Sequence, residues 1–121
     1  MTKIQNSKRY DLEDRTLKFA KEVRGFVKKL SKTTGNFEDG KQLVRSSGSI
    51  GANYIEANEA LSKKDFRHRI KISRKEAKET IYWLNLVDIG ENNNLKKEKN
   101  GLINEATELM KIFGSIVEKS K

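Results

Sequence analysis

Apolar residues recur at helical spacing in four stretches of the chain, separated by polar or turn-forming residues. The spacing predicts helices over about 11–30, 37–61, 63–87 and 95–119. No stretch alternates apolar and polar residues with a period of two for long enough to predict a strand. Helices of about 20–25 residues joined by loops of about 2–8 residues pack as antiparallel neighbours. The pattern therefore predicts a single-domain, all-α, antiparallel up-down four-helix bundle.

Each predicted helix carries one apolar stripe, which we expect to form the core. The four stripes, in chain order, are Leu12, Phe19, Val23, Phe26, Val27 and Leu30; Leu43, Ser47, Ile50, Tyr54, Ala57 and Leu61; Phe66, Ile70, Ser73, Ala77, Ile81 and Leu84; and Leu102, Ala106, Leu109, Met110, Phe113 and Val117.

Turn-forming residues mark the ends of these helices. The segment 31–36 is a turn-rich break in which Gly35 suits a left-handed conformation. Ser62 is a good N-cap for the third helix, and Gly90 is expected to end it.

The second helix contains Gly48 and Gly51, each of which costs about 1 kcal/mol relative to alanine inside a helix. Close approach of a neighbouring helix is the simplest feature that would offset this cost. A phosphate-binding glycine loop is the alternative, but the segment lacks the Lys-Ser/Thr ending and the preceding strand of a P-loop.

Three motifs follow one another between residues 43 and 87. They are Arg45, Ser46, Ser49, Ile50, Asn53 and Glu56; then Ser62, Lys63, Asp65 and Phe66; then Glu76, Glu79, Trp83 and Leu84. In this order and spacing they resemble the four-helix-bundle family of 23S rRNA intervening-sequence proteins. The resemblance covers the second and third helices by motif, and the first and fourth only by hydrophobic pattern.

The resemblance implies a ring-like homo-oligomer, commonly a pentamer, with no established enzymatic activity. The family is also similar in fold to the accessory protein of diversity-generating retroelements, which binds nucleic acid and a reverse transcriptase. Because fold alone does not give function, nucleic-acid binding is carried to this chain only as an analogy.

Positive charge is concentrated on two of the predicted helices. The 121 residues include 26 Lys or Arg and 17 Asp or Glu, which gives a net charge of +9. Residues 63–87 hold eight basic and three acidic residues, and residues 8–30 hold eight and four. A strong positive balance is an argument about polyanionic partners and solubility.

On the third helix the charge also has a direction. Five cations at spacings of three and four residues form one ridge, roughly a quarter turn from the apolar stripe. Cations repeated about every 5.4 Å suit a phosphate backbone, so we expect RNA or DNA to bind through the first and third helices by backbone contacts. The alternative is a solvated face whose lysine stems cover apolar surface. The ridge consists of Lys64, Arg67, Lys71, Arg74 and Lys78.

Two polar sets are candidates for an interface or for fixing helix register. Arg45, Ser49, Asn53 and Glu56 share a second face of the second helix, where we expect a buried or interfacial hydrogen-bond network, with a ligand or RNA contact as the alternative. Ile72, Glu76, Glu79 and Trp83 lie on the flank of the third helix away from the ridge. We expect a subunit interface there, because tryptophan anchors are common at interface centres; the alternative is an amphipathic edge with Trp83 covering the core.

The remaining composition argues against an enzyme. There is no cysteine, so thiol nucleophiles, zinc–thiolate sites and disulfides are excluded. The single histidine, His68, is expected to be solvent-exposed, and no Glu lies three residues before it, as a di-metal carboxylate bundle requires. We therefore expect no catalytic residues, no metal and no cofactor.

The chain is expected to be cytoplasmic, without a membrane role, because it has neither a secretory apolar region nor an apolar run near the roughly 18 residues of a membrane helix. The expected function is a non-enzymatic homo-oligomer that binds nucleic acid. The alternative is a structural or adaptor oligomer that binds a protein partner and has no nucleic-acid role.

Overall fold

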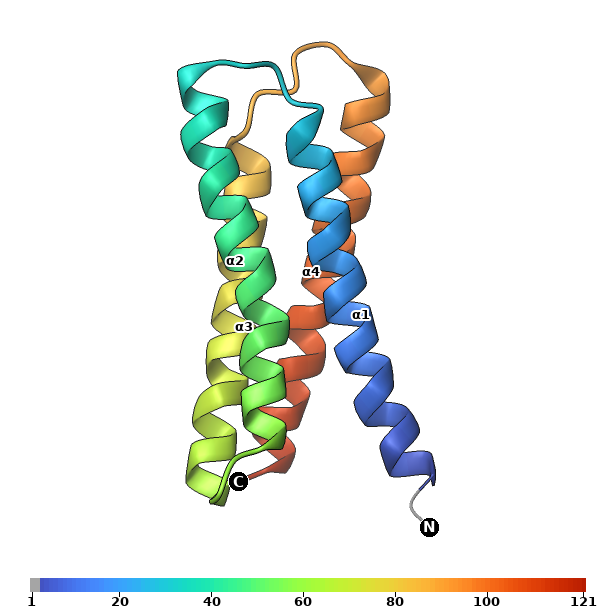
Figure 1. Ribbon diagram of the computed structural model, residues 1–121, viewed down its shortest axis with the longest axis vertical. Coiled ribbons are helices and arrows are strands. Elements are labelled where there is room, and N and C mark those ends of the chain that lie inside the picture. The colour runs from blue at the N-terminus through green and yellow to red at the C-terminus, as the bar shows by residue number, and fades with distance from the viewer. Residues whose placement is uncertain (1–2) are drawn as a thin grey trace.

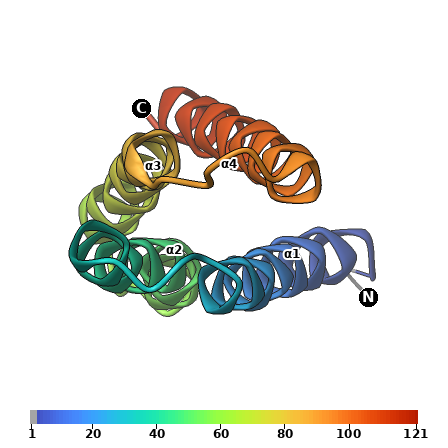
Figure 2. The ribbon, with the colours of Figure 1, turned by 90° about the horizontal axis from the view of Figure 1, so that it is seen from above.

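Four long helices account for most of the chain. The computed structural model describes the backbone of residues 3–121 and the side chains of residues 12–121. The helices are α1 (Lys3–Lys28), α2 (Thr34–Asn58), α3 (Lys63–Leu86) and α4 (Asn93–Lys119), and residues 3–121 contain no strand. They run alternately up and down one long axis, and from above they follow one another around the bundle in chain order (Figures 1 and 2). The all-α, antiparallel bundle is therefore confirmed.

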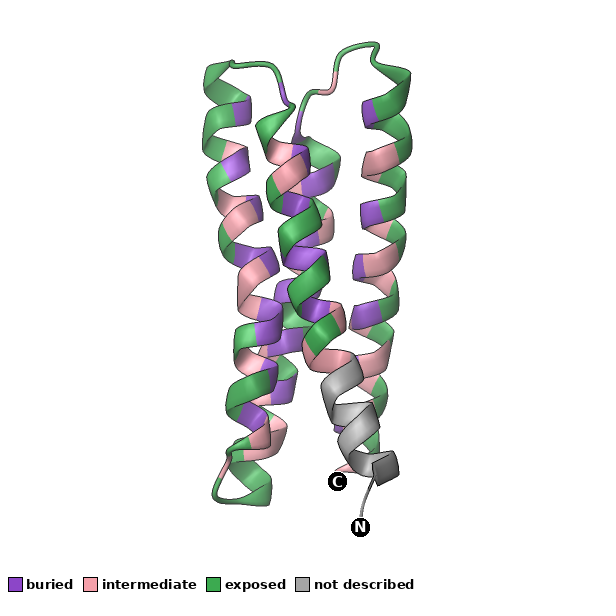
Figure 3. Cartoon of the chain, turned by 45° about the vertical axis from the view of Figure 1, so that its right-hand side comes forward, coloured by how far each residue is buried: buried purple, intermediate pink, exposed green. Residues whose placement is uncertain are grey.

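The core is built from the four apolar stripes, whose buried positions face the inside of the bundle (Figure 3). Phe19, Phe26 and Phe113 are among its largest fully buried side chains. One stripe residue was predicted wrongly: Leu61 is 100% exposed. Because α2 ends at Asn58, Leu61 lies in the connection to α3. The helical spacing of apolar residues therefore no longer applies at this position.

Side-chain caps set the starts of three helices. Thr33, Ser62 and Asn92 each accept a hydrogen bond from the backbone N–H three residues on, so Ser62 is confirmed as the cap of α3. Because Thr33 is the N-cap, α2 begins at Thr34 and not at residue 37, where the sequence predicted its start. Gly35 therefore lies inside the first helical turn.

The prediction of a left-handed Gly35 is therefore wrong, since the only positive φ among the described residues is the 61° of Gly90. Gly90 also does not terminate the helix directly, because α3 ends at Leu86. Its N–H instead donates to Asp88 Oδ1 at 2.8 Å in the loop between α3 and α4.

Glycine allows α1 to lie close to α2 at one point. A Cβ at Gly51 would lie 2.7 Å from Thr16 Oγ1 and 3.0 Å from Thr16 Cβ, so the expected close approach is confirmed at this residue. At Gly48 the nearest atoms are the guanidinium nitrogens of Arg24, 3.8 and 3.9 Å away, which is ordinary contact. The two glycines therefore have different packing roles.

Contacts between helices are most extensive for α2 with α3 and least extensive for α1 with α4. Buried hydroxyls join the first pair: Thr80 Oγ1 lies 2.8 Å from Ser46 Oγ, and Ser73 Oγ donates to Ile50 O at 2.9 Å. The second pair is linked by an ion pair of Arg15 with Glu105, and Lys29, directly after α1, pairs with Glu98 of α4. The pair α2 and α3, which carries the recognised motifs, thus makes the most extensive contacts in the bundle.

In the described part of the chain, no helix combines the length and the apolar character needed to cross a membrane.

Candidate nucleic-acid interface

The basic ridge lies along α3, whose first turn is fixed by the Ser62 cap. Lys64, Lys71, Arg74 and Lys78 are exposed. Arg67 is half-buried, and its Nε is buried without a hydrogen-bond partner among the described residues. Arg67 is therefore less exposed than the other members of the ridge, and its Nε is covered by the protein.

Part of this ridge forms one wall of a concave site between α3 and α4. The concavity has a volume of about 500 Å³ and is lined by five cationic side chains and a methionine, with no acidic residue among them. Arg74 crosses toward α4, because its Cδ lies 3.6 Å from the position that a Cβ would take at Gly114. The lining residues, which we call the basic groove, are Lys71, Arg74, Lys75, Lys78, Met110 and Lys111.

Two cations of the basic groove were missed from the sequence. Lys75 was left out of the ridge in favour of Arg74, although it lies four residues after Lys71 and three before Lys78. Lys111 lies on α4, and its contribution depends on the register between α3 and α4, which periodicity within one helix does not reveal. A search for cations adjacent to the ridge would have found Lys75 but not Lys111.

The opposite flank of α3 carries a hydrogen-bonded cluster shared with α2. Arg45 of α2 donates from Nη1 to Glu76 Oε1 at 3.2 Å and from Nη2 to Glu79 Oε1. Trp83 Nε1 also donates to Glu79 Oε1, at 3.0 Å. The guanidinium further donates from Nε to Gln42 at 3.0 Å. The structure thus joins members of the two polar sets that the sequence placed on separate helices.

Electrostatics within this cluster favour the charged forms. The Trp83 N–H and the Arg45 guanidinium lower the pKa of Glu79 below its usual value, although burial acts in the opposite direction. For Arg45, burial lowers the pKa, but Glu76 and Glu79 together raise it by more. The pKa of Arg45 is therefore above its usual value. The cluster is therefore a satisfied ion network within one chain.

The other members of the two sets are placed separately. Asn53 Nδ2 donates to Ser49 O at 2.9 Å, and Asn53 Oδ1 lies 3.5 Å from Arg69 Nη1 of α3. Glu56 is exposed and joins neither group of bonds among the described residues, and Ile72 is half-buried. The quartet on α2 is therefore divided, with Arg45 and Asn53 contacting different turns of α3.

His68 is exposed, as expected. Among side chains 12–121, no three His, Cys, Asp or Glu residues form a group that could hold a metal ion.

Comparison with known proteins identifies a family and a similar solved structure. A family model described as 23S rRNA-intervening sequence protein matches residues 8–115. Among solved structures, the chain is similar to a protein of unknown function from the S23 ribosomal protein family of Bacteroides thetaiotaomicron, with 35% identity and a TM-score of 0.78. That alignment covers 92% of this chain and 98% of the other. None of the curated proteins compared with the chain matches it.

Proposed function

The chain belongs to the 23S rRNA-intervening sequence protein family, and we propose that it is a non-enzymatic homo-oligomer that binds the backbone of RNA or DNA through the basic groove. The observation that carries the proposal is a concave site lined by five cations and no carboxylate. A site of this kind attracts phosphates without reading bases, because phosphate contacts position a nucleic acid but carry no sequence information.

The arrangement of α3 supports this choice of face. Its flank toward α2 uses Glu76 and Glu79 to neutralise Arg45, whereas its flank toward α4 gathers cations only. A net charge of +9 adds long-range attraction for a polyanion at low salt. The basic groove is therefore better suited to nucleic acid than a surface where charges of both signs alternate.

The direct test is fluorescence anisotropy with a structured RNA and with a DNA duplex, each at 50 and 200 mM salt. Each phosphate that is neutralised adds about 0.7–0.9 to the slope of log affinity against log salt, so five contacts give a slope near −4. The variant Lys71→Glu/Lys78→Glu/Lys111→Glu should bind at least about tenfold more weakly and with a shallower slope.

A control of equal charge separates the groove from the total charge of the protein. Lys96→Glu/Lys97→Glu/Lys119→Glu reverses three exposed lysines of α4 that do not line the groove. We expect the control to retain most of the affinity. An equal loss of affinity in both variants would show that net charge, and not the groove, causes the binding. Absent or salt-independent binding by the wild type would contradict the proposal.

Self-association is the second part of the proposal, and an exposed apolar group near Trp83 supports it. Tyr82 is 60% exposed and meets the Trp83 ring edge-on at 5.0 Å, and Leu86 one turn later is also exposed. Tyr82 lies one turn after Lys78, and on its other side Glu76 and Glu79 are neutralised within the chain, so a second copy that covers Trp83 does not bury unpaired carboxylates.

The oligomeric mass and its dependence on this flank can be measured by size-exclusion chromatography with light scattering. A pentamer would have five times the 13.9 kDa mass of the chain. Tyr82→Glu should dissociate the assembly, and Leu17→Glu, at an exposed apolar residue of α1, should not. Dissociation by Leu17→Glu alone would place the interface on α1 instead.

The alternative function, an adaptor for a protein partner, is favoured by the same exposed flank. It predicts that the Tyr82→Glu variant loses the partner, whereas neither nucleic-acid probe binds to the wild type. The anisotropy measurement therefore separates the two functions before any partner is known.

A further inference from the structure

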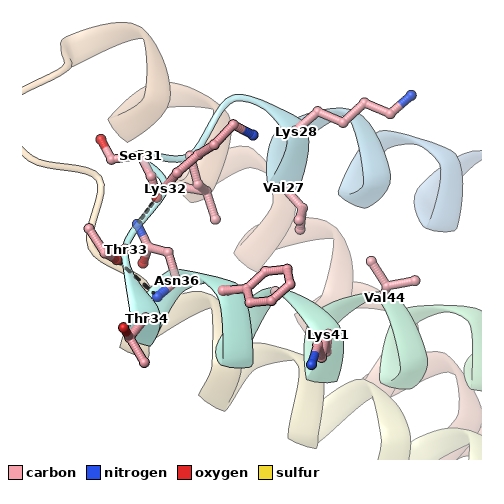
Figure 4. Close-up of a pocket in the computed structure, with 12 residues that line it drawn as sticks. Val27, Lys28, Ser31, Lys32, Thr33, Thr34, Asn36, Lys41 and Val44 are labelled. Carbon is pink, nitrogen blue, oxygen red and sulfur yellow. Dashed lines mark hydrogen bonds between the residues drawn. The ribbon is translucent and has the colours of Figure 1, made fainter.

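A second pocket lies at the end of the bundle where α1 turns into α2 (Figure 4). Its volume is about 770 Å³, within the range of roughly 300–1,000 Å³ that is usual for small-molecule sites. The last turns of α1, the segment 31–33 and the first three turns of α2 line it. No residue of the basic groove contributes to it, so the two sites are independent.

The interior of this pocket is apolar. Val27 of α1 faces Phe37 and Val44 of α2, and Phe37 remains 65% exposed although it is aromatic. Gly40 lets α1 and α2 approach closely at the pocket wall, since a Cβ there would lie 3.0 Å from Val27 Cγ1. Apolar surface gathered in a concave site gains free energy when a ligand removes it from water.

The rim of the pocket is cationic. Lys28, Lys32 and Lys41 line it, and none of the lining residues is acidic. Lys41 is already engaged, with its Nζ 4.7 Å from the centre of the Phe37 ring and 3.4 Å from Glu38. Lys28 and Lys32 are exposed and make no ion pair with the described residues, so they are available to an anion.

One wall of the pocket is held in place by hydrogen bonds. The buried side chain of Asn36 donates to Ser31 O and Asp88 O and accepts from the Asp88 N–H. These bonds tie the turn between α1 and α2 to the loop that follows α3. This wall of the site is therefore preformed, which lowers the entropy cost of binding.

We propose that this pocket binds a small amphipathic anion, an aliphatic chain that ends in a carboxylate. The chain contacts Phe37, Val27 and Val44, and the carboxylate is neutralised by Lys28 and Lys32. This inference goes beyond the nucleic-acid proposal and does not rest on it, because no residue of the pocket belongs to the basic groove. The combination of apolar interior and cationic rim selects against neutral and cationic ligands of the same length.

Equilibrium dialysis of the full chain with radiolabelled dodecanoate, below its micelle concentration, tests the inference. We expect saturable binding of one molecule per chain. Butanoate keeps the charge but lacks eight methylenes, each worth about 0.8 kcal/mol when buried, and dodecyltrimethylammonium keeps the chain but reverses the charge. Both should bind at least about tenfold more weakly than dodecanoate.

Matched variants locate the binding. Phe37→Ala and Lys28→Glu/Lys32→Glu should each weaken dodecanoate binding by about tenfold. Tyr82→Ala removes an aromatic side chain of similar exposure on α3, and Lys96→Glu/Lys97→Glu reverses two exposed lysines of α4; both should leave the affinity unchanged.

Several results would overturn the inference. These are no saturable binding, equal binding of the cationic amphiphile, binding only above the micelle concentration, and equal weakening by the control variants. A change in oligomeric mass caused by Phe37→Ala would show that a second copy of the chain covers the pocket, and this too would overturn it.

Discussion

At the scale of single residues, Gly48 and Gly51 are three positions apart on α2 and respond differently to the same substitution. Glycine to alanine in a helix gains about 1 kcal/mol from propensity alone. At Gly51 the added methyl meets the fully buried Thr16, whose Oγ1 also donates to Leu12 O at 2.8 Å and whose χ1 is stiff. Overpacking costs about 1–3 kcal/mol, so Gly51→Ala should lower the free energy of unfolding by about 1 kcal/mol.

Gly48→Ala is the internal control for this prediction, because its methyl meets only the movable end of Arg24 and should raise stability by about 0.5–1 kcal/mol. Urea denaturation of both variants measures the difference. Thr16→Ala added to Gly51→Ala should restore part of the loss. Equal stabilisation by both alanines would show that α1 shifts at Thr16 and makes room for the added methyl group.

Glu79 is the residue whose ionisation should make stability depend on pH. Its pKa is lowered in the folded protein by the Trp83 N–H and by Arg45, so its contribution is present above the unfolded pKa of about 4.3 and is lost as pH falls through the folded value. Because the side chain is one-third exposed, we expect Glu79→Gln to cost less than about 1 kcal/mol at pH 7. The difference from wild type should shrink toward pH 3.

Urea midpoints at pH 7 and pH 3 measure this change, and Glu108→Gln, at an exposed carboxylate of α4, should show no comparable pH-dependent difference. A wild-type advantage over Glu79→Gln that persists unchanged at pH 3 would exclude linkage through Glu79.

At the scale of the secondary-structure elements, Asn36 holds three segments together at one end of the bundle. Asn36→Ala leaves the backbone N–H and carbonyl of Asp88 without their partner and should cost about 1–3 kcal/mol. Hydrogen exchange at the Asp88 amide should become faster. Asn85→Ala is the control, since Asn85 is exposed and, among the described residues, donates to Ile81 O within its own helix. Equal effects of the two substitutions would mean that the loop after α3 is held by other contacts.

The helices themselves follow from local patterns, whereas the places where they meet do not. Periodicity located the stripes because burying one face of a helix requires a 3.6-residue repeat, and Ser62 was recognisable because its cap is a local bond. Leu61 was misplaced because periodicity does not mark the residue at which α2 ends. The bonds of Asn36 to Asp88 span 52 residues, so no pattern in either segment could predict them.

The candidate site shows the same division between local and long-range information. The ridge from Lys64 to Lys78 could be read from one helix, but the concavity requires Lys111 of α4. The cluster of Arg45 with Glu76 and Glu79 likewise depends on the register of α2 against α3. The sequence predicted the helix faces, and tertiary packing determined which faces became one site.

At the scale of the whole molecule, the net charge of +9 should make the folded state sensitive to ionic strength. At about 0.01 M salt the Debye length is about 30 Å, so repulsion acts between cations across much of the bundle, and at 0.15 M it falls to about 8 Å. Exposed ion pairs contribute about 0–1 kcal/mol each and are weakened by the same salt. Because cations exceed carboxylates by nine, repulsion should dominate, and the urea midpoint should rise between 10 and 150 mM NaCl.

The two charge variants locate this repulsion. Both triple variants change the net charge equally: the groove variant is Lys71→Glu/Lys78→Glu/Lys111→Glu, and the control is Lys96→Glu/Lys97→Glu/Lys119→Glu. The groove variant removes cations where five of them line one concavity. We expect the groove variant to show the higher midpoint at 10 mM NaCl and the smaller rise with salt. A wild-type midpoint that falls as salt is added would mean that ion pairs outweigh repulsion. In the free protein the cations of the groove repel one another, and bound phosphate would relieve this repulsion. The stability measurement and the salt slope of nucleic-acid binding should therefore depend on the same residues.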